Sequence, residues 1–192
     1  MYYNLIISLS YLYIRKELQM NSTPSHEEFE EIIKPIIENK EIQKMKYYMQ
    51  HADVSCFEHC KNVAYYSYYI CKKLNLDYKS AARASMLHDF FLYDWRLPAT
   101  DRKGFHAFTH PRTSLDNALK YFELNDKEKD IILKHMWPVT IKLPKYKESY
   151  IITLTDKFSA LFETMKYYNK KPGFQKIYSN FVIFLAILFL KS

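Results

Sequence analysis

The sequence predicts an all-α, single-domain helical bundle, and three features lead to this expectation. Only two of the 192 residues are glycine, whereas tight hairpins and phosphate-binding loops need glycine at positive φ. Hydrophobic residues make up 48% of the chain, which is enough for one buried core in a chain of this length. Apolar residues recur at the helical period in several stretches. Together these features argue against an all-β fold and against nucleotide-binding loops.

The two ends of the chain are strongly apolar. Residues 2–14 lack the preceding charged region and the cleavage site of a signal peptide. This stretch and residues 181–190 are both too short to span a bilayer. We expect residues 1–19 to be an N-terminal extension, with Met20 as a possible biological start that mass spectrometry of the native protein would test. Residues 171–192 are predicted to form a buried apolar C-terminal helix, with membrane-surface or partner contact as the alternative.

Residues 20–50 are predicted to form N-terminal helices. Ser25 is a good capping residue and is followed by acidic residues, a pattern typical of a helix start. This helix is expected to run to about Asn39, with a kink or a restart at Pro35. A second helix is expected over residues 41–50.

Residues 51–170 are predicted to form the main domain. Its clearest helix covers residues 55–74, and the next one, over residues 78–93, is rich in alanine and serine, which favours close helix packing. Residues 94–108 lack periodicity and are expected to form a long loop of the kind that often carries function. Further helices are expected over residues 109–122, 126–136 and 149–167.

The charge and the cysteines restrict the class of protein. The net charge of +7 suits an anionic substrate, but no block of like charges marks a basic arm, so nucleic acid is not expected as a partner. Cys56, Cys60 and Cys71 have no zinc-ligand partners at matching spacing, and we expect reduced, buried thiols. An odd cysteine count without a secretory signal predicts a cytoplasmic protein.

Several polar residues occur in apolar surroundings on the predicted helices. Asp156 lies on the same helical face as Ile152, and a buried carboxylate costs several kcal/mol unless it is paired or binds a metal. A single histidine in a helix is usually a core or surface residue, but a group of polar residues directed toward one core needs a common partner. The candidates for metal ligands are His59, His88, Asp89, His110, His135 and Asp156.

The order His, His-Asp, His, His and Asp over residues 59–156 resembles the HD-domain phosphohydrolase superfamily. The His-Asp pair alone is a weak signal, but the ordered set is fairly specific. The pattern is most similar to the dinuclear branch, and within it to bacterial hydrolases of symmetrical diadenosine tetraphosphate. In those enzymes the third His begins a helix and the last Asp precedes a Lys, as in Asp156-Lys157. The resemblance implies an HD-type helical bundle and a metal-dependent phosphohydrolase.

The resemblance also implies two divalent transition-metal ions. Imidazole and carboxylate ligands suit Fe, Mn, Co, Ni or Zn better than Ca or Mg. A hydroxide that bridges the ions would then attack phosphorus, because bound metal lowers the pKa of water. One ion would be held by His59, His88, Asp89 and Asp156, and the other by Asp89, His110 and His135.

Further residues are candidates for catalysis and substrate binding. Asp89 would be catalytic as the bridge, Lys157 follows a ligand directly, and His106 is placed to assist a leaving group. Guanidinium and ammonium groups suit phosphate oxygens. The candidate substrate contacts are Arg96, Arg102, Lys103 and Arg112.

The sequence departs from its relatives after the His-Asp pair. Many relatives continue with Ile-Gly-Lys or Ile-Ala-Lys, whereas this chain continues with Phe90, Phe91 and Leu92, so the substrate contact made by that Lys is missing. The Gly-Tyr-Pro tripeptide of cyclic-di-GMP phosphodiesterases is absent too, which argues against that activity. We expect a small-molecule nucleotide or another phosphoester as the substrate.

Two functions from other classes compete with this hypothesis. One is a catalytically silent HD domain that binds nucleotides or acts in signalling, although all six candidate ligands are present. The other is a membrane-associated interaction protein that uses its apolar ends, for which no transmembrane span is predicted.

Overall fold

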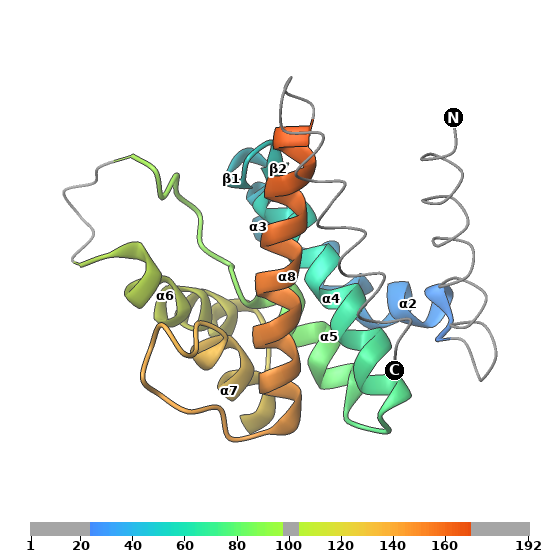
Figure 1. Cartoon of the computed structure of the whole chain (residues 1–192). Helices are drawn as coiled ribbons and strands as arrows, with labels where there is room; N and C mark the ends of the chain where they lie inside the picture. The colour runs from blue at the N-terminus through green and yellow to red at the C-terminus, as the bar shows by residue number, and fades with distance from the viewer. Residues whose placement is uncertain (1–23, 98–103, 170–192) are drawn as a thin grey trace, which may run out of the picture.

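A computed structural model describes residues 24–97 and 104–169 of the chain, and these residues form a predominantly helical bundle (Figure 1). The predicted all-α single domain is confirmed. The predictions for residues 1–19 and 171–192 fall outside the described residues. The elements are α2 (His26–Ile37), α3 (Lys40–Gln43), the 3-10 helix η1 (Lys44–Tyr47), β1 (Met49–His51), β2 (Val54–Ser55), α4 (Cys56–Lys73), α5 (Tyr78–Leu87), α6 (His106–Tyr121), α7 (Asp126–Lys134) and α8 (Lys147–Asn169).

Side-chain caps fix where most of these helices begin. The predicted cap Ser25 accepts a hydrogen bond from a backbone N–H of α2. Ser55 begins α4 and Asn125 begins α7, each in a capping box with the glutamate three residues later. The expected restart at Pro35 does not occur, because α2 continues through it to Ile37. A proline in the last turn removes only one hydrogen bond of the helix.

The predicted helix over residues 41–50 is wrong in its second half. The chain forms α3 and η1 there and then the short antiparallel hairpin of β1 and β2. Ala52 takes the left-handed conformation in the turn, with φ of 54°. The scarcity of glycine therefore excluded a large sheet but not this one small hairpin, because a single residue other than glycine can adopt positive φ at a modest cost.

Two helix boundaries near the site also differ from the prediction. α5 ends at Leu87 instead of residue 93, so His88 caps the helix and Asp89 follows it. α6 begins at His106 instead of residue 109, which shortens the expected loop over residues 94–108. The early start of α6 places His106 and His110 one turn apart on one helix.

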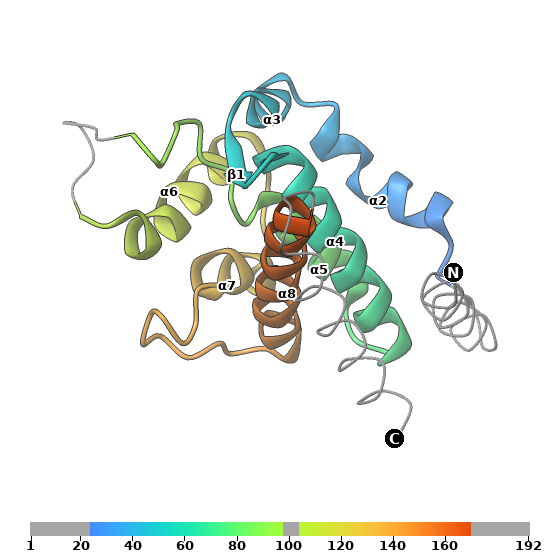
Figure 2. The ribbon, with the colours of Figure 1, turned by 45° about the horizontal axis from the view of Figure 1, so that its top comes forward.

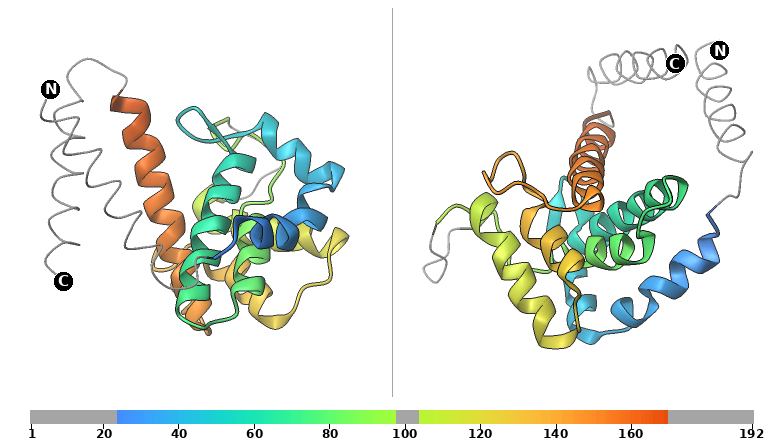
Figure 3. Two further views of the ribbon diagram at one scale, coloured as in Figure 1. Left: turned by 90° about the vertical axis from the view of Figure 1, so that its right-hand side faces the viewer. Right: turned by 90° about the horizontal axis from the view of Figure 1, so that it is seen from below.

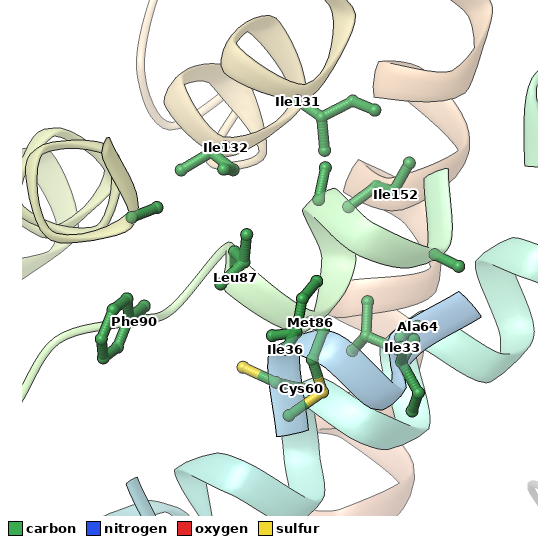
Figure 4. Packing of buried hydrophobic residues seen from close by; sticks show 14 of the residues in the cluster. Ile33, Ile36, Cys60, Ala64, Met86, Leu87, Phe90, Ile131, Ile132 and Ile152 are labelled. Atoms are coloured by element: carbon green, nitrogen blue, oxygen red, sulfur yellow. The ribbon is translucent and has the colours of Figure 1, made fainter. Parts of the chain in front are cut away.

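The helices are arranged so that α8 lies between α4 and α7, with α2 beyond α4 and α6 beyond α7 (Figure 2). α5 passes behind this row, and its small residues let it pack closely on α4. Figure 4 shows Met86 of α5 among Ile36 of α2 and Cys60 of α4 in the main hydrophobic cluster. Buried apolar side chains of this kind supply most of the stability of such a bundle.

The described residues also bear on the cysteines and on membrane insertion. Cys56, Cys60 and Cys71 are buried and carry free thiols, as the sequence predicts. Across residues 24–97 and 104–169, none of the helices combines the length and the apolar character needed to cross a bilayer.

Candidate metal centre

Side chains from five helical segments meet in the interior between α4, α6, α7 and α8. α4 and α8 each contribute one of them, the end of α5 contributes an adjacent pair, and α6 and the end of α7 contribute one each. All are less than a tenth exposed. They are the six predicted ligands His59, His88, Asp89, His110, His135 and Asp156.

One half of this cluster is formed around Asp156. Its Oδ1 lies 3.1 Å from Nε2 of His59 and 3.6 Å from Nε2 of His88. Nε2 of His88 lies 3.5 Å from Oδ2 of Asp89. His59, His88 and Asp156 thus offer three ligand atoms around one point, and we call this group the Asp156 half.

The other half is formed by His110 and His135. Their Nε2 atoms are 2.9 Å apart. Oδ1 of Asp89 lies 3.2 Å from the first and 3.4 Å from the second. We call these two histidines the His110–His135 half. Asp89 stands between the two halves, because Oδ2 faces His88 and Oδ1 faces His110 and His135.

The separations between these atoms fit metal coordination. Bonds from nitrogen or oxygen to a transition metal are about 2.0–2.2 Å, so neighbouring ligands in octahedral or tetrahedral sites lie roughly 2.8–3.6 Å apart. The separations above run from 2.9 Å to 3.6 Å. Both halves are therefore compact enough to hold an ion.

The hydrogen bonds of the imidazoles fix which nitrogen faces the cluster. Nδ1 of His110 and Nδ1 of His135 each donate to a backbone carbonyl, at 2.7 Å and 2.8 Å. A carbonyl oxygen only accepts, so Nδ1 carries the proton and a neutral ring presents a lone pair at Nε2. Two such lone pairs 2.9 Å apart repel each other unless a cation lies between them.

Two further atoms of the cluster that could bind a metal have no hydrogen-bond partner among the described residues. Nε2 of His88 and Oδ1 of Asp89 are buried without a hydrogen-bond partner among the described residues, and each has another atom of the cluster within 3.5 Å. Nδ1 of His88 donates to the carbonyl of Ser85 at 2.6 Å, so Nε2 is the nitrogen that faces the cluster, and it presents a lone pair when the ring is neutral. Buried polar atoms without partners cost free energy, and a bound metal removes that cost. The chemistry of these atoms therefore fits a metal.

Sequence reasoning missed two residues that support the ligands. Oε2 of Glu163 accepts from Nδ1 of His59 at 2.9 Å, and Asn62 donates to Oε1 of the same carboxylate at 3.1 Å. Gln50, on strand β1, donates to Oδ2 of Asp89. Such partners orient the ligands of metal sites. Glu163 was detectable, since it lies seven residues after Asp156 on the same face of α8, but the hairpin that brings Gln50 was not.

Electrostatics in the Asp156 half favour a bound cation. Burial opposes the charged forms of His59 and His88, but Asp156, Glu163 and Asp89 outweigh burial and hold both pKa values well above their usual range. Burial also opposes ionisation of Asp89 and Asp156, yet the histidines hold both pKa values well below their usual range. The carboxylates thus remain charged and attract protons or metal ions, which compete for the same atoms.

His135 differs from His59 and His88 in the direction of its pKa shift. Burial lowers its pKa, and the neighbouring His88 and His110 lower it further, while Asp89 acts in the opposite direction. A histidine with a lowered pKa is neutral at pH 7, as a metal ligand must be.

Lys157, predicted to be catalytic, lies beside the cluster. Its ammonium donates to the carbonyl oxygens of His135 and Thr153 and stands 4.0 Å from Oδ2 of Asp156. Burial lowers its pKa, while Asp156 and Asp89 act in the opposite direction. Lys157 therefore ties the end of α7 to α8 at the edge of the cluster.

His106, the other predicted catalytic residue, stacks directly on a ligand. Its ring lies 4.4 Å from the ring of His110, and Trp95 stacks against it at 5.4 Å. Nδ1 of His106 lies 3.1 Å from the hydroxyl of Tyr93. The imidazole is thus held in one orientation next to the His110–His135 half.

The predicted substrate contacts are less clearly placed. Arg96 forms a two-point ion pair with Asp94, whereas Arg112 contacts Asp116 through its Nε. Arg102 and Lys103 lie outside the described residues. The structure therefore leaves all four as predictions.

A cavity of about 510 Å³ lies close to the His110–His135 half. Pro111, which follows His110, lines it, as does Leu133, two residues before His135. Its lining is mostly apolar but includes the charged side chains of Arg112 and Lys142. Its size suits a small molecule with an anionic group.

Comparison of the chain with protein-family models, curated proteins and solved structures finds no match in any of the three. The HD-domain resemblance thus remains an expectation from the order of the ligands. The helical fold and the buried cluster of histidine and aspartate are compatible with a metal site.

Proposed function

We propose that this protein is a metal-dependent phosphohydrolase that cleaves a phosphoester or phosphoanhydride bond of a nucleotide. The observation that carries the proposal is the position of Asp89. Its two oxygens face two separate groups of imidazoles, one in each half of the cluster. A carboxylate can bridge two ions in this way, whereas an imidazole cannot.

The donor set also suits the proposed chemistry. Two bound divalent ions would lower the pKa of water and offset charge on phosphoryl oxygens. Four neutral imidazoles and two carboxylates contribute a charge of −2, so two divalent ions leave the centre at about +2 and attractive to a phosphate.

The chain's own residues would then position the substrate and the ligands. Asp89 links the two halves, Glu163 orients His59, and Lys157 holds the carbonyl of His135. His106, next to His110, is the residue that we propose to donate a proton to the leaving group. Because Lys157 already binds two carbonyl oxygens, we infer that it positions the centre and does not act as the proton donor.

Metal analysis on a matched pair of variants tests this proposal. The protein is purified without chelator or affinity metal, loaded with Mn²⁺ or Fe²⁺ under reducing conditions, and assayed on a panel of nucleotides and simple phosphoesters. We expect about two ions per chain. Asp89→Ala is compared with Asp126→Asn, which removes a carboxylate that is exposed at the start of α7.

The possible outcomes separate the competing functions. Two ions and hydrolysis that are lost in Asp89→Ala but kept in Asp126→Asn would support the phosphohydrolase. Bound metal without hydrolysis of any substrate on the panel would favour a catalytically silent binding domain. Protein that takes up no metal even after reconstitution would contradict the proposal at its first step.

A further inference from the structure

Helix α8 has an unusual distribution of side chains. Its inward side is mostly polar and includes the buried residues Ser149, Thr155, Asp156, Ser159 and Glu163. Its outward side is apolar: Leu154 is 55% exposed, Phe158 49% and Leu161 40%. A helix at the surface of a soluble domain usually shows the opposite pattern.

The position of α8 in the bundle accounts for this inversion. Its inner face borders the metal-ligand cluster, so polar side chains are required there. α8 forms one edge of the bundle in the left view of Figure 3. The apolar side chains on its outer side therefore contribute little to the main core.

The spacing of the apolar residues identifies what would cover them. Leu154, Phe158, Leu161 and Met165 follow one another at intervals of four, three and four residues. This alternation is the heptad pattern by which one helix packs along another. The outer side of α8 thus has the pattern of a surface that binds a helix, and we call these four residues the α8 seam.

We propose that the chain's own C-terminal segment, residues 181–190, packs as a helix against the α8 seam. These ten residues are all apolar, so any face of such a helix would suit the seam. They lie outside the described residues, and the inference rests on the seam and on the sequence that follows it. It is independent of the proposed hydrolase activity.

The length of the intervening chain permits this packing. α8 has 23 residues and is about 34 Å long. Residues 170–180 can extend over roughly 36 Å, which is enough to return along the whole helix. In the sequence, Pro172 and Gly173 come three and four residues after Asn169, the last described residue of α8, and this pair favours a turn.

The covalent connection favours this segment over a second copy of the chain. A short linker keeps the segment near the seam at an effective concentration in the millimolar range. A second copy at micromolar concentration competes poorly with it.

Thiol labelling in the full-length chain tests the proposal. Leu161→Cys places a reactive thiol in the seam, while the natural cysteines are buried. Lys120→Cys, on exposed α6, is the matched control. We expect the seam thiol to react with a maleimide at least about tenfold more slowly than the control, and Phe184→Asp with Leu188→Asp to remove this protection.

Disulfide formation identifies the occupant directly. Leu161→Cys combined with Ala186→Cys is expected to form a disulfide within one chain on mild oxidation, at a yield independent of protein concentration. Lys120→Cys with Ala186→Cys is expected to form none. Disulfides only between chains would show that a second copy covers the seam and would overturn the proposal.

The labelling has two further outcomes that oppose the proposal. Equal reaction rates at the seam and at the control position would show that nothing covers α8. Protection that appears only when anionic lipid vesicles are added would show that a membrane surface is the occupant.

Discussion

Two clusters of polar side chains in this protein, one partly exposed and one buried, differ in how their polar atoms are paired. In the first, Glu28 of α2 accepts hydrogen bonds from Tyr68 and Lys72 of α4 and from Tyr78 of α5. Its carboxylate has donors on both oxygens and a cation as partner. We call these four residues the Glu28 cluster. It is complete without any ligand.

The metal-ligand cluster is incomplete by the same measure. Nε2 of His110 and Nε2 of His135 lie 2.9 Å apart and repel each other when both rings are neutral, and Nε2 of His88 has no hydrogen-bond partner among the described residues. The comparison teaches that the residue types do not distinguish a structural ion pair from a binding site. The distinction lies in whether each hydrogen-bond acceptor has a donor and each charge has a counter-charge within the protein.

Substitution of Asp89 is expected to have the largest effect. Asp89→Ala removes the carboxylate whose two oxygens face the two halves, so metal content should fall from about two ions per chain toward zero, and hydrolysis by more than about a hundredfold. Elemental analysis and a phosphoester assay measure both quantities. Full metal content in this variant would show that the ligand assignment is wrong.

Substitution of His110 is expected to remove one of the two proposed ions and to leave the other bound. His110→Ala removes one ligand of the His110–His135 half and leaves the Asp156 half intact, so about one of two ions should be lost. Titration of the metal-free protein with Mn²⁺, followed by calorimetry, distinguishes the two binding events. Simultaneous loss of both ions would mean that the halves do not bind independently.

Glu163→Gln tests the support of the Asp156 half. The amide can still accept a hydrogen bond from His59, but the negative charge is lost, so metal affinity should fall by about tenfold to a hundredfold. Competition with a chelator measures this change. Glu31→Gln, at an exposed position on α2, is the control and should leave the affinity unchanged.

Glu28→Gln is expected to have the smallest effect. It should lower the free energy of unfolding by an amount that depends on pH and does not depend on bound metal. Lys72 and Tyr68 lower the pKa of Glu28 to about 2. The ionised carboxylate therefore adds stability above its unfolded pKa, and this contribution is lost as the pH falls from roughly 4.5 to 2.

Because the Glu28 cluster is partly exposed, its contribution should not exceed about 1 kcal/mol. Urea unfolding of Glu28→Gln and of the natural protein at pH 7 and near pH 3 measures it. We expect a difference at pH 7 that shrinks at the lower pH. If added metal changed the difference in unfolding free energy between Glu28→Gln and the natural protein, the Glu28 cluster would not be independent of metal as we expect.

The sequence by itself determined the helical class and the six candidate ligands. Helical periodicity and the lack of glycine are local properties, so α4 and α7 were predicted to within a residue or two. Asp156 stood out because a carboxylate on an apolar helical face requires a partner. That argument needs only the spacing of residues on one helix.

The tertiary structure alone decided which atoms meet and what supports them. Gln50 reaches Asp89 through a hairpin whose turn is formed by Ala52, and no local pattern signals such a turn. The pairing of His110 with His135 depends on where α6 and α7 begin and end and on their packing. Contacts between residues distant in sequence are set by packing of the whole core, and local propensity does not contain that information.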